Sequence, residues 1–199
     1  MSVPILEMKN ITKEFPGVRA LDDVSFKVER QNIHCLVGEN GAGKSTLMKV
    51  LSGVHPYGSY EGEIHFDGEL QRFKSTRDSE QAGIAVIYQE LALVPEMTVY
   101  ENVFLGHEIR NGINVDINET IKQTVNVLKK VGLDVNPETK IKHLGIGKQQ
   151  LVEIAKALIF DAKIIIFDEP TSSLSGEEIK ELFSMIKKVK SKGVSVIYI

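Results

Sequence analysis

The chain has 199 residues, of which 42% are hydrophobic and 26% are charged, and its formal net charge at pH 7 is −3. This composition is that of an ordinary globular domain, and the small negative charge gives no electrostatic reason to expect nucleic acid as a partner. The longest apolar runs are too short to span a bilayer, so we expect any membrane association to come through partner subunits. The lone cysteine, Cys35, excludes an internal disulfide and favours a cytosolic setting.

The first part of the chain is expected to consist mainly of strands. Apolar patterns predict strands at residues 3–8, 24–28, 31–37, 63–66 and 84–88. Cys35 falls inside the strand at 31–37, where it is expected to be a buried, reduced small hydrophobe. Two helices are predicted among these strands, at residues 46–51 and 75–82.

Residues 90–160 are expected to form a mostly helical insertion. The spacing of Thr98 and Glu101 predicts a capping box that starts a short helix. Asp116 is placed to cap a longer helix, which would end at Gly132. Its expected apolar face consists of Ile117, Ile121, Val125 and Leu128. A third helix is predicted at residues 149–160, with a buried side made of Leu151, Ile154 and Leu158.

The last part of the chain returns to an alternation of strand and helix. Residues 163–167 form a continuous apolar run, typical of a strand buried on both faces, and residues 194–199 predict another. Between them, Ser175 and Glu178 form a second capping box, and Gly193 is expected to end that helix. Its expected inward residues are Ile179, Leu182, Phe183, Ile186 and Val189. The pattern predicts an α/β fold with a parallel sheet, whose core comprises residues 1–89 and 161–199.

Residues 38–46 read GENGAGKST, a complete phosphate-binding loop between a predicted strand and a predicted helix. Glycines let the backbone turn its N–H groups toward a polyphosphate, and the helix N-terminus adds a partial positive charge. Lys44 would contact the β- and γ-phosphates and Ser45 would bind Mg²⁺. The alternative is a glycine-rich turn without a ligand. The predicted nucleotide ligands here are Gly38, Glu39, Asn40, Gly41, Ala42, Gly43, Lys44, Ser45 and Thr46.

Two carboxylates follow the apolar run at residues 163–167, where ligands bind in open α/β sheets. Asp168 is expected to hold Mg²⁺, and Glu169 to orient or deprotonate the attacking water. The alternative is that both residues merely cap the next element. Gln89, after the strand at 84–88, is a candidate for binding Mg²⁺ or the water, although such a residue is usually a surface residue. Phe15 is a candidate to stack on an adenine ring, or else a core residue.

These motifs, in this order and spacing, resemble the nucleotide-binding domain of ABC transporters. The resemblance rests on the phosphate loop and on residues 11–21 (ITKEFPGVRAL), 86–91 (VIYQEL), 144–151 (LGIGKQQL) and 164–174 (IIIFDEPTSSL). It covers essentially the whole chain and implies a P-loop NTPase core with N-terminal antiparallel strands and a helical subdomain. The stretches 55–68, 90–106 and 149–158 are similar to the first of two tandem domains in monosaccharide importers of the D-xylose type.

The resemblance also implies roles that spacing alone does not give. Phe15 matches the adenine-stacking aromatic residue, Gln89 the glutamine that links Mg²⁺ to the membrane domain, and residues 172–175 the D-loop. The family signature Leu-Ser-Gly-Gly-Gln, which binds ATP held by an opposite domain, is matched by Leu144, Gly145, Ile146, Gly147 and Lys148. The chain departs from the family here, because Gly145 has no hydroxyl and Lys148 replaces glutamine. Ser175 replaces the usual D-loop aspartate, and the expected histidine after residues 194–199 is missing.

The resemblance implies an ATP-hydrolysing motor that uses Mg²⁺ and powers sugar import from the cytoplasmic face of the membrane. Its expected partners are permease subunits, a second nucleotide-binding domain and, indirectly, an extracellular or periplasmic sugar-binding protein. The missing histidine implies that the chain is the first part of a longer protein, with weak activity by itself. Two alternatives are a nucleotide-binding switch with little turnover and a soluble ABC ATPase, which would need a coiled-coil insertion or a basic arm.

Overall fold

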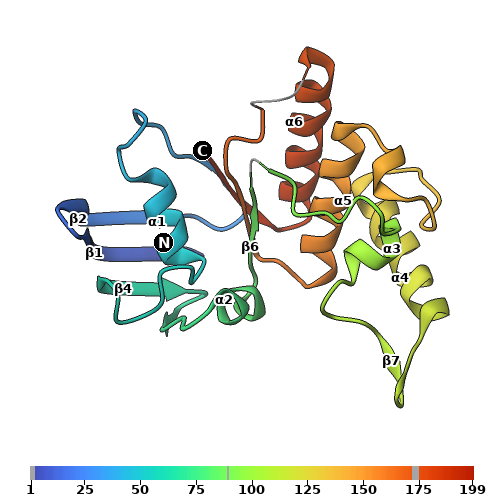
Figure 1. Cartoon of the computed structure of the whole chain (residues 1–199). Coiled ribbons are helices and arrows are strands. Elements are labelled where there is room, and N and C mark those ends of the chain that lie inside the picture. Colours follow the sequence, from blue (N-terminus) through green and yellow to red (C-terminus); the bar gives the residue numbers. More distant parts are fainter. Residues whose placement is uncertain (1–2, 89, 172–174) are drawn as a thin grey trace. The chain divides into compact units, whose positions relative to one another are not determined.

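The computed structural model describes residues 3–88, 90–171 and 175–199 (Figure 1). Its internal contacts divide the chain into two compact units. The first comprises Met1–Val86, Ala162–Glu169 and Val189–Ile199, and the second comprises Ile87–Asp161 and Pro170–Lys188. Residues 170–188 are expected in the core from the sequence, whereas these contacts group them with the helices. The division into a catalytic core and a helical domain stays a prediction.

An antiparallel sheet occupies the N-terminal part of the first unit. It contains β1 (Leu6–Phe15), β2 (Val18–Val28), β4 (Glu61–Phe66) and β5 (Glu69–Gln71), in the order β2-β1-β4-β5. Apolar residues of alternating positions point to its buried face, among them Leu6, Met8, Ile64 and Phe66. The strands β1 and β2 are longer than predicted. Shifts in their pairing between Met8 and Lys13 interrupt the alternation on which the prediction depended.

A second sheet of the first unit has the order β3-β10-β9-β6. Its strands are β3 (Ile33–Cys35), β10 (Ser195–Tyr198), β9 (Ile164–Phe167) and β6 (Ile84–Ile87). Both β3 and β9 run parallel to β10, which confirms the expected parallel core. All four residues of β9 are buried, as its apolar run predicts. Helices α1 (Lys44–Leu51) and α2 (Thr76–Ala82) belong to the same unit and follow the predicted ones closely.

The strand β3 is shorter and more exposed than the sequence predicts. Its residues are half-buried or exposed, and Val37 beyond it is 89% exposed. Among the described strands β3 pairs with β10 alone, so one edge of it stays open. The expectation that Cys35 is buried is therefore wrong, because the thiol lies on an exposed edge strand.

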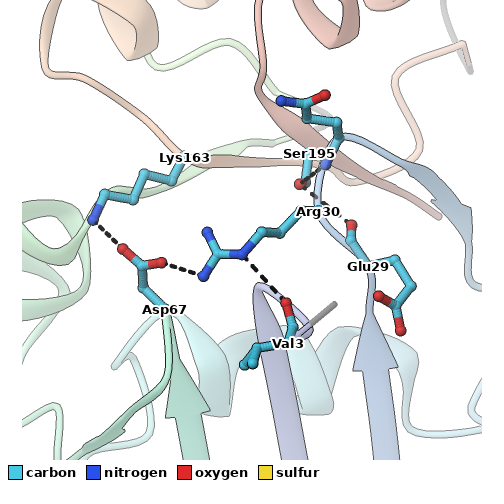
Figure 2. A network of polar contacts seen from close by, with 7 residues as sticks. Val3, Glu29, Arg30, Asp67, Lys163 and Ser195 are labelled. Atoms are coloured by element: carbon cyan, nitrogen blue, oxygen red, sulfur yellow. Dashed lines mark hydrogen bonds and ion pairs between the residues drawn. The ribbon is translucent and has the colours of Figure 1, made fainter. Parts of the chain in front are cut away.

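A network of polar contacts joins the two sheets of the first unit (Figure 2). Asp67, just after β4, accepts hydrogen bonds from the guanidinium of Arg30 and from the ammonium of Lys163, the latter at 2.6 Å. Lys163 directly precedes β9. Ser195, the first residue of β10, accepts a hydrogen bond of 2.9 Å from the backbone N–H of Gln31. These contacts hold the ends of the antiparallel strands beside the starts of β9 and β10.

The second unit is built mainly from helices (Figure 1). They are α3 (Val99–Val103), α4 (Ile117–Val131), the 3₁₀ turn η1 (Ile141–His143), α5 (Ile146–Ile159) and α6 (Gly176–Ser191), whose last residues belong to the first unit. A short hairpin, β7 (Arg110–Asn111) and β8 (Asn114–Val115), precedes α4. Helix α5 packs against α3 and α4. Both predicted capping boxes form, at Thr98 and Glu101 and at Ser175 and Glu178.

The buried faces of these helices differ from the predicted ones. In α4 the buried residues are Thr120, Thr124, Val127, Leu128 and Val131, whereas Ile117 is 51% exposed. The two threonines can be buried because each hydroxyl donates to the backbone carbonyl four residues earlier. In α6 the expected inward residue Phe183 is exposed and Met185 is buried instead.

Helix α5 begins at Ile146, three residues earlier than predicted, and its buried face is partly polar. Leu151 and Leu158 are only half-buried, whereas Gln150 is 7% exposed. The side chain of Gln150 donates a 3.0 Å hydrogen bond to the carbonyl of Pro170. This hydrogen bond offsets the cost of burying the polar amide. Apolar periodicity cannot predict such a pairing.

Candidate nucleotide-binding site

Glycines allow the tight course of the loop between β3 and α1. Gly41 and Gly43 have φ of 85° and 88°, in the left-handed region that side chains disfavour. A Cβ on Gly43 would lie 2.6 Å from the carbonyl oxygen of Ala20 and 2.9 Å from Leu21, so only glycine fits against β2. Gly43 is also the N-cap of α1 and makes no side-chain cap. The N–H groups of the first turn of α1 therefore lack a side-chain acceptor and suit an anion.

The side chain of Lys44 folds back over the phosphate loop that precedes it. Its Nζ donates to the carbonyl oxygens of Gly38 at 2.7 Å and of Glu39 at 2.9 Å. An ammonium group has three N–H donors, so one remains for a ligand oxygen. The backbone of the loop thus fixes the lysine charge at the helix N-terminus, where both effects attract a phosphate.

A cavity of about 380 Å³ opens beside this loop in the first unit. Seven of the predicted site residues line it: Asn40, Gly41, Gly43, Lys44, Ser45, Thr46 and Glu169. Val18, Arg19 and Ala20 of β2 line it as well. These three residues are not predicted as site residues from the sequence, because only the antiparallel pairing of β1 and β2 brings the hairpin beside the loop. The cavity therefore combines a lysine, two hydroxyl groups and a carboxylate around one space.

Phe15 stands at the end of β1 and pairs with Val18 across the hairpin. It is 38% exposed, and it is not among the described residues that line the cavity. Its ring packs edge-on against His55, with centroids 5.3 Å apart, and the ammonium of Lys13 lies 5.0 Å from its centre. Since Val18 lines the cavity, Phe15 is one strand away from it. Its stacking on adenine stays a prediction.

Asp168 and Glu169 follow the end of β9, and β10 separates that strand from β3. Burial, and then the nearby charge of Glu169, raise the pKa of Asp168, while Lys49 and Lys44 act in the opposite direction. Such a partly desolvated carboxylate gains from a divalent cation, so Asp168 and the exposed hydroxyl of Ser45 have the oxygen donors that suit Mg²⁺. Glu169 adopts a φ of 46°, which is unusual for a residue other than glycine and typical of functional turns.

The remaining predicted site residues lie in the second unit or outside the described residues. Gln89 and residues 172–174 are outside them. Leu144 is buried, Gly145 is the extended N-cap of α5, and Ile146, Gly147 and Lys148 form its first turn. A Cβ on Gly145 would meet nothing within 4 Å. The missing serine hydroxyl is therefore a chemical difference from the family and not a steric one.

A strand, a glycine loop, a helix N-terminus and a carboxylate pair after a second parallel strand together define the class of P-loop NTPases. The sequence profile of the family described as ABC transporter matches residues 21–172, and the chain belongs to this family. None of the described helices is long and apolar enough to cross a membrane.

Curated relatives and solved structures agree with this assignment. The chain is 58% identical over 195 residues to the xylose import ATP-binding protein XylG of Geobacillus kaustophilus, which covers 98% of the chain and 39% of that protein. It is 56% identical over 200 residues to the L-arabinose transport ATP-binding protein AraG of Geobacillus stearothermophilus, covering 100% and 39%. An ATP-binding cassette of an ABC transporter in its ADP conformation superposes with a TM-score of 0.86 at 28% identity, covering 99% of this chain and 81% of that one. The expected fold class is confirmed. The chain spans about two fifths of the length of these curated relatives.

Proposed function

We propose that the chain is an ATP-binding and ATP-hydrolysing motor domain. The observation that carries this proposal is one cavity in which Lys44, Ser45 and the unusual carboxylate Glu169 meet at the N-terminus of α1. A charge-fixed lysine and free helix N–H groups suit the β- and γ-phosphates of a nucleotide. A carboxylate at the rim of the same space suits the attacking water.

Each residue has a defined part in this mechanism. Lys44 and the loop N–H groups hold the phosphates in line, which lowers the barrier through positioning and charge stabilisation. Ser45, Asp168 and Gln89 are the proposed holders of Mg²⁺, which when bound neutralises charge on the β- and γ-oxygens. Glu169 orients the water and takes its proton as the water oxygen bonds to the γ-phosphorus. The bond from the γ-phosphorus to the β,γ-bridging oxygen breaks in the same step, and ADP leaves with that oxygen.

A second nucleotide-binding domain is the proposed partner for turnover. In this arrangement the phosphate loop of one domain faces the signature segment of the other, which here is Leu144, Gly145, Ile146, Gly147 and Lys148. Since Gly145 brings no hydroxyl, backbone N–H groups and the charge of Lys148 would contact the γ-phosphate. The proposal needs a whole transporter, because a single domain has only one half of each site.

We also propose that the motor powers sugar import at the cytoplasmic face of the membrane, through permease subunits and an associated sugar-binding protein. The support comes from the relatives, which are a xylose import ATP-binding protein and an L-arabinose transport ATP-binding protein. D-xylose is the proposed cargo. The deciding experiment reconstitutes the full-length protein with its permease and binding protein in vesicles. ATP-dependent uptake of labelled xylose is expected to exceed that of arabinose and ribose, and ATP hydrolysis without any sugar uptake would contradict the transport part.

A further inference from the structure

The first turn of α5 lies against a carboxylate of another helix. Its N-cap, Gly145, makes no side-chain hydrogen bond, and the turn contains no acidic residue. The first N–H groups of a helix have no partner within the helix and need one from elsewhere. The carboxylate of Glu178, which belongs to α6, lies beside this turn, and the backbone of Gly147 helps to favour its charged form. A Cβ on Gly147 would lie 3.4 Å from Cγ and 3.6 Å from Oε1 of Glu178, so the two segments are in close contact.

The same carboxylate caps its own helix. Oε2 of Glu178 accepts from the backbone N–H of Ser175 at 2.9 Å and from its hydroxyl at 2.8 Å. These hydrogen bonds, and to a smaller extent the backbone of Gly147, lower the pKa of Glu178, so the group is ionised at neutral pH. One charged side chain therefore joins the first turn of α5 to the first turn of α6. All three residues belong to the second unit.

The contact changes which groups of the signature segment are available. The carboxylate of Glu178 lies beside Gly147, so the phosphate of an opposing nucleotide would meet Gly145, Ile146 and Lys148 more readily than Gly147. A negative charge in this turn also disfavours an anion, and Lys148 is the cation in the same turn that offsets it. The orientation of the turn then depends on Glu178, because Gly145 has no side chain with which to cap the helix.

We infer that Glu178 is a positioning residue, which fixes the signature segment relative to the D-loop residue Ser175. This inference rests on the proposed ATPase function. It assigns to Glu178 a part in turnover across two domains and none in the nucleotide affinity of one domain, because the phosphate loop belongs to the first unit.

The test uses the full-length protein with its permease subunits and three variants: Glu178→Ala, Glu178→Gln and Glu177→Ala. Glu177 is the matched control, being an exposed carboxylate in the same helical turn. Glu178→Ala is expected to lower kcat about tenfold, the size of one charge-assisted hydrogen bond, and to change KM for ATP less than about twofold. Glu178→Gln keeps an acceptor oxygen and should recover to within about threefold of the native kcat. Glu177→Ala should match the native protein.

A second readout separates positioning from a general loss of structure. With Glu169→Gln added to slow hydrolysis, Glu178→Ala should reduce the ATP-bound closed pair of domains, measured by cross-linking, while calorimetric MgADP affinity stays native. The inference would be overturned if kcat of Glu178→Ala falls only in proportion to a loss of folded protein, seen as a lowered melting temperature. A raised kcat in Glu178→Ala would overturn it as well. If Lys44→Ala abolishes turnover while Glu178→Ala equals Glu177→Ala, the proposed function stands and this inference fails. If the native assembly hydrolyses no ATP, both fail.

Discussion

The ammonium of Lys44 lies 2.7 Å from the carbonyl oxygen of Gly38, so the lysine folds back over its own loop. Residues 38 and 39 are exposed, and water can replace the lysine at both carbonyl oxygens without a buried group being left unsatisfied. The position of the lysine therefore favours phosphate binding, and its removal is expected to change the free energy of unfolding little.

Lys44→Ala is therefore expected to weaken nucleotide binding while the fold stays intact. Loss of a charge-assisted contact of about 1.5–3 kcal/mol corresponds to roughly a tenfold to hundredfold rise in the dissociation constant for MgATP. Calorimetric titration measures this change, and circular dichroism with a thermal melt serves as the control for folding. Equal affinity in the two proteins would remove Lys44 from the proposed site.

Glu169→Gln should separate binding from hydrolysis. The amide has nearly the shape of the carboxylate but cannot accept the proton of the water, so hydrolysis in the assembled full-length protein should fall at least about 100-fold. MgATP affinity should be retained, and the closed pair of domains should persist in ATP. The measurement is single-turnover ATP hydrolysis beside a binding titration. Native turnover in this variant would move the base to another residue.

Residues 90–106 are expected to form the docking surface for permease subunits. Val94 and Leu105 in this stretch are each 38% exposed, which is a large apolar exposure for positions close to Gln89 in the sequence. Cysteines at either position should cross-link to the permease in the assembled transporter. Cys35 is exposed and must first be replaced by serine, so that it does not react. Glu181→Cys on α6 is the control, and cross-links formed only from that position would reject the assignment.

Asp67→Asn is expected to destabilise the first unit by about 1 kcal/mol or less, because the side chain is 33% exposed and its ion pairs are partly screened. Asp22→Asn, which removes a pair with Arg19 at a side chain 69% exposed, is the matched control and should change the free energy of unfolding less. Urea unfolding at neutral pH measures both. An equal effect of the two substitutions would mean that the network in Figure 2 adds nothing to an ordinary surface pair.

The contribution of Asp67 should also depend on pH. Hydrogen bonds from Lys163 and then Arg30 lower the pKa of Asp67 in the folded protein. Its stabilising effect is then fully present above the unfolded value of about 3.9 and is lost as the pH falls through the lower folded value. The difference in unfolding free energy between the native protein and Asp67→Asn should shrink over that acidic range. A difference that grows with acidity would contradict the ion-pair explanation.

Features that depend on neighbouring residues can be predicted from the amino-acid sequence. The phosphate loop, the two capping boxes and the buried strand β9 are each specified within a few positions, through backbone conformation, local hydrogen bonds or an unbroken apolar run. The nucleotide-site residues Phe15, Gln89 and Asp168 are proposed from their positions beside predicted strands and loops and from the order of the motifs. Their roles stay predictions.

The contacts between groups far apart in the chain follow from the tertiary fold. It brought Arg19 of β2 to the phosphate-loop cavity, left Cys35 on an open edge strand and placed the carboxylate of Glu178 beside Gly147. It also buried Thr120 and Thr124, whose hydroxyls are satisfied within their own helix. Apolar periodicity reports that a residue faces some partner, but the identity of that partner follows from strand pairing and helix packing. Those contacts join residues far apart in the chain, and no local pattern in the sequence encodes them.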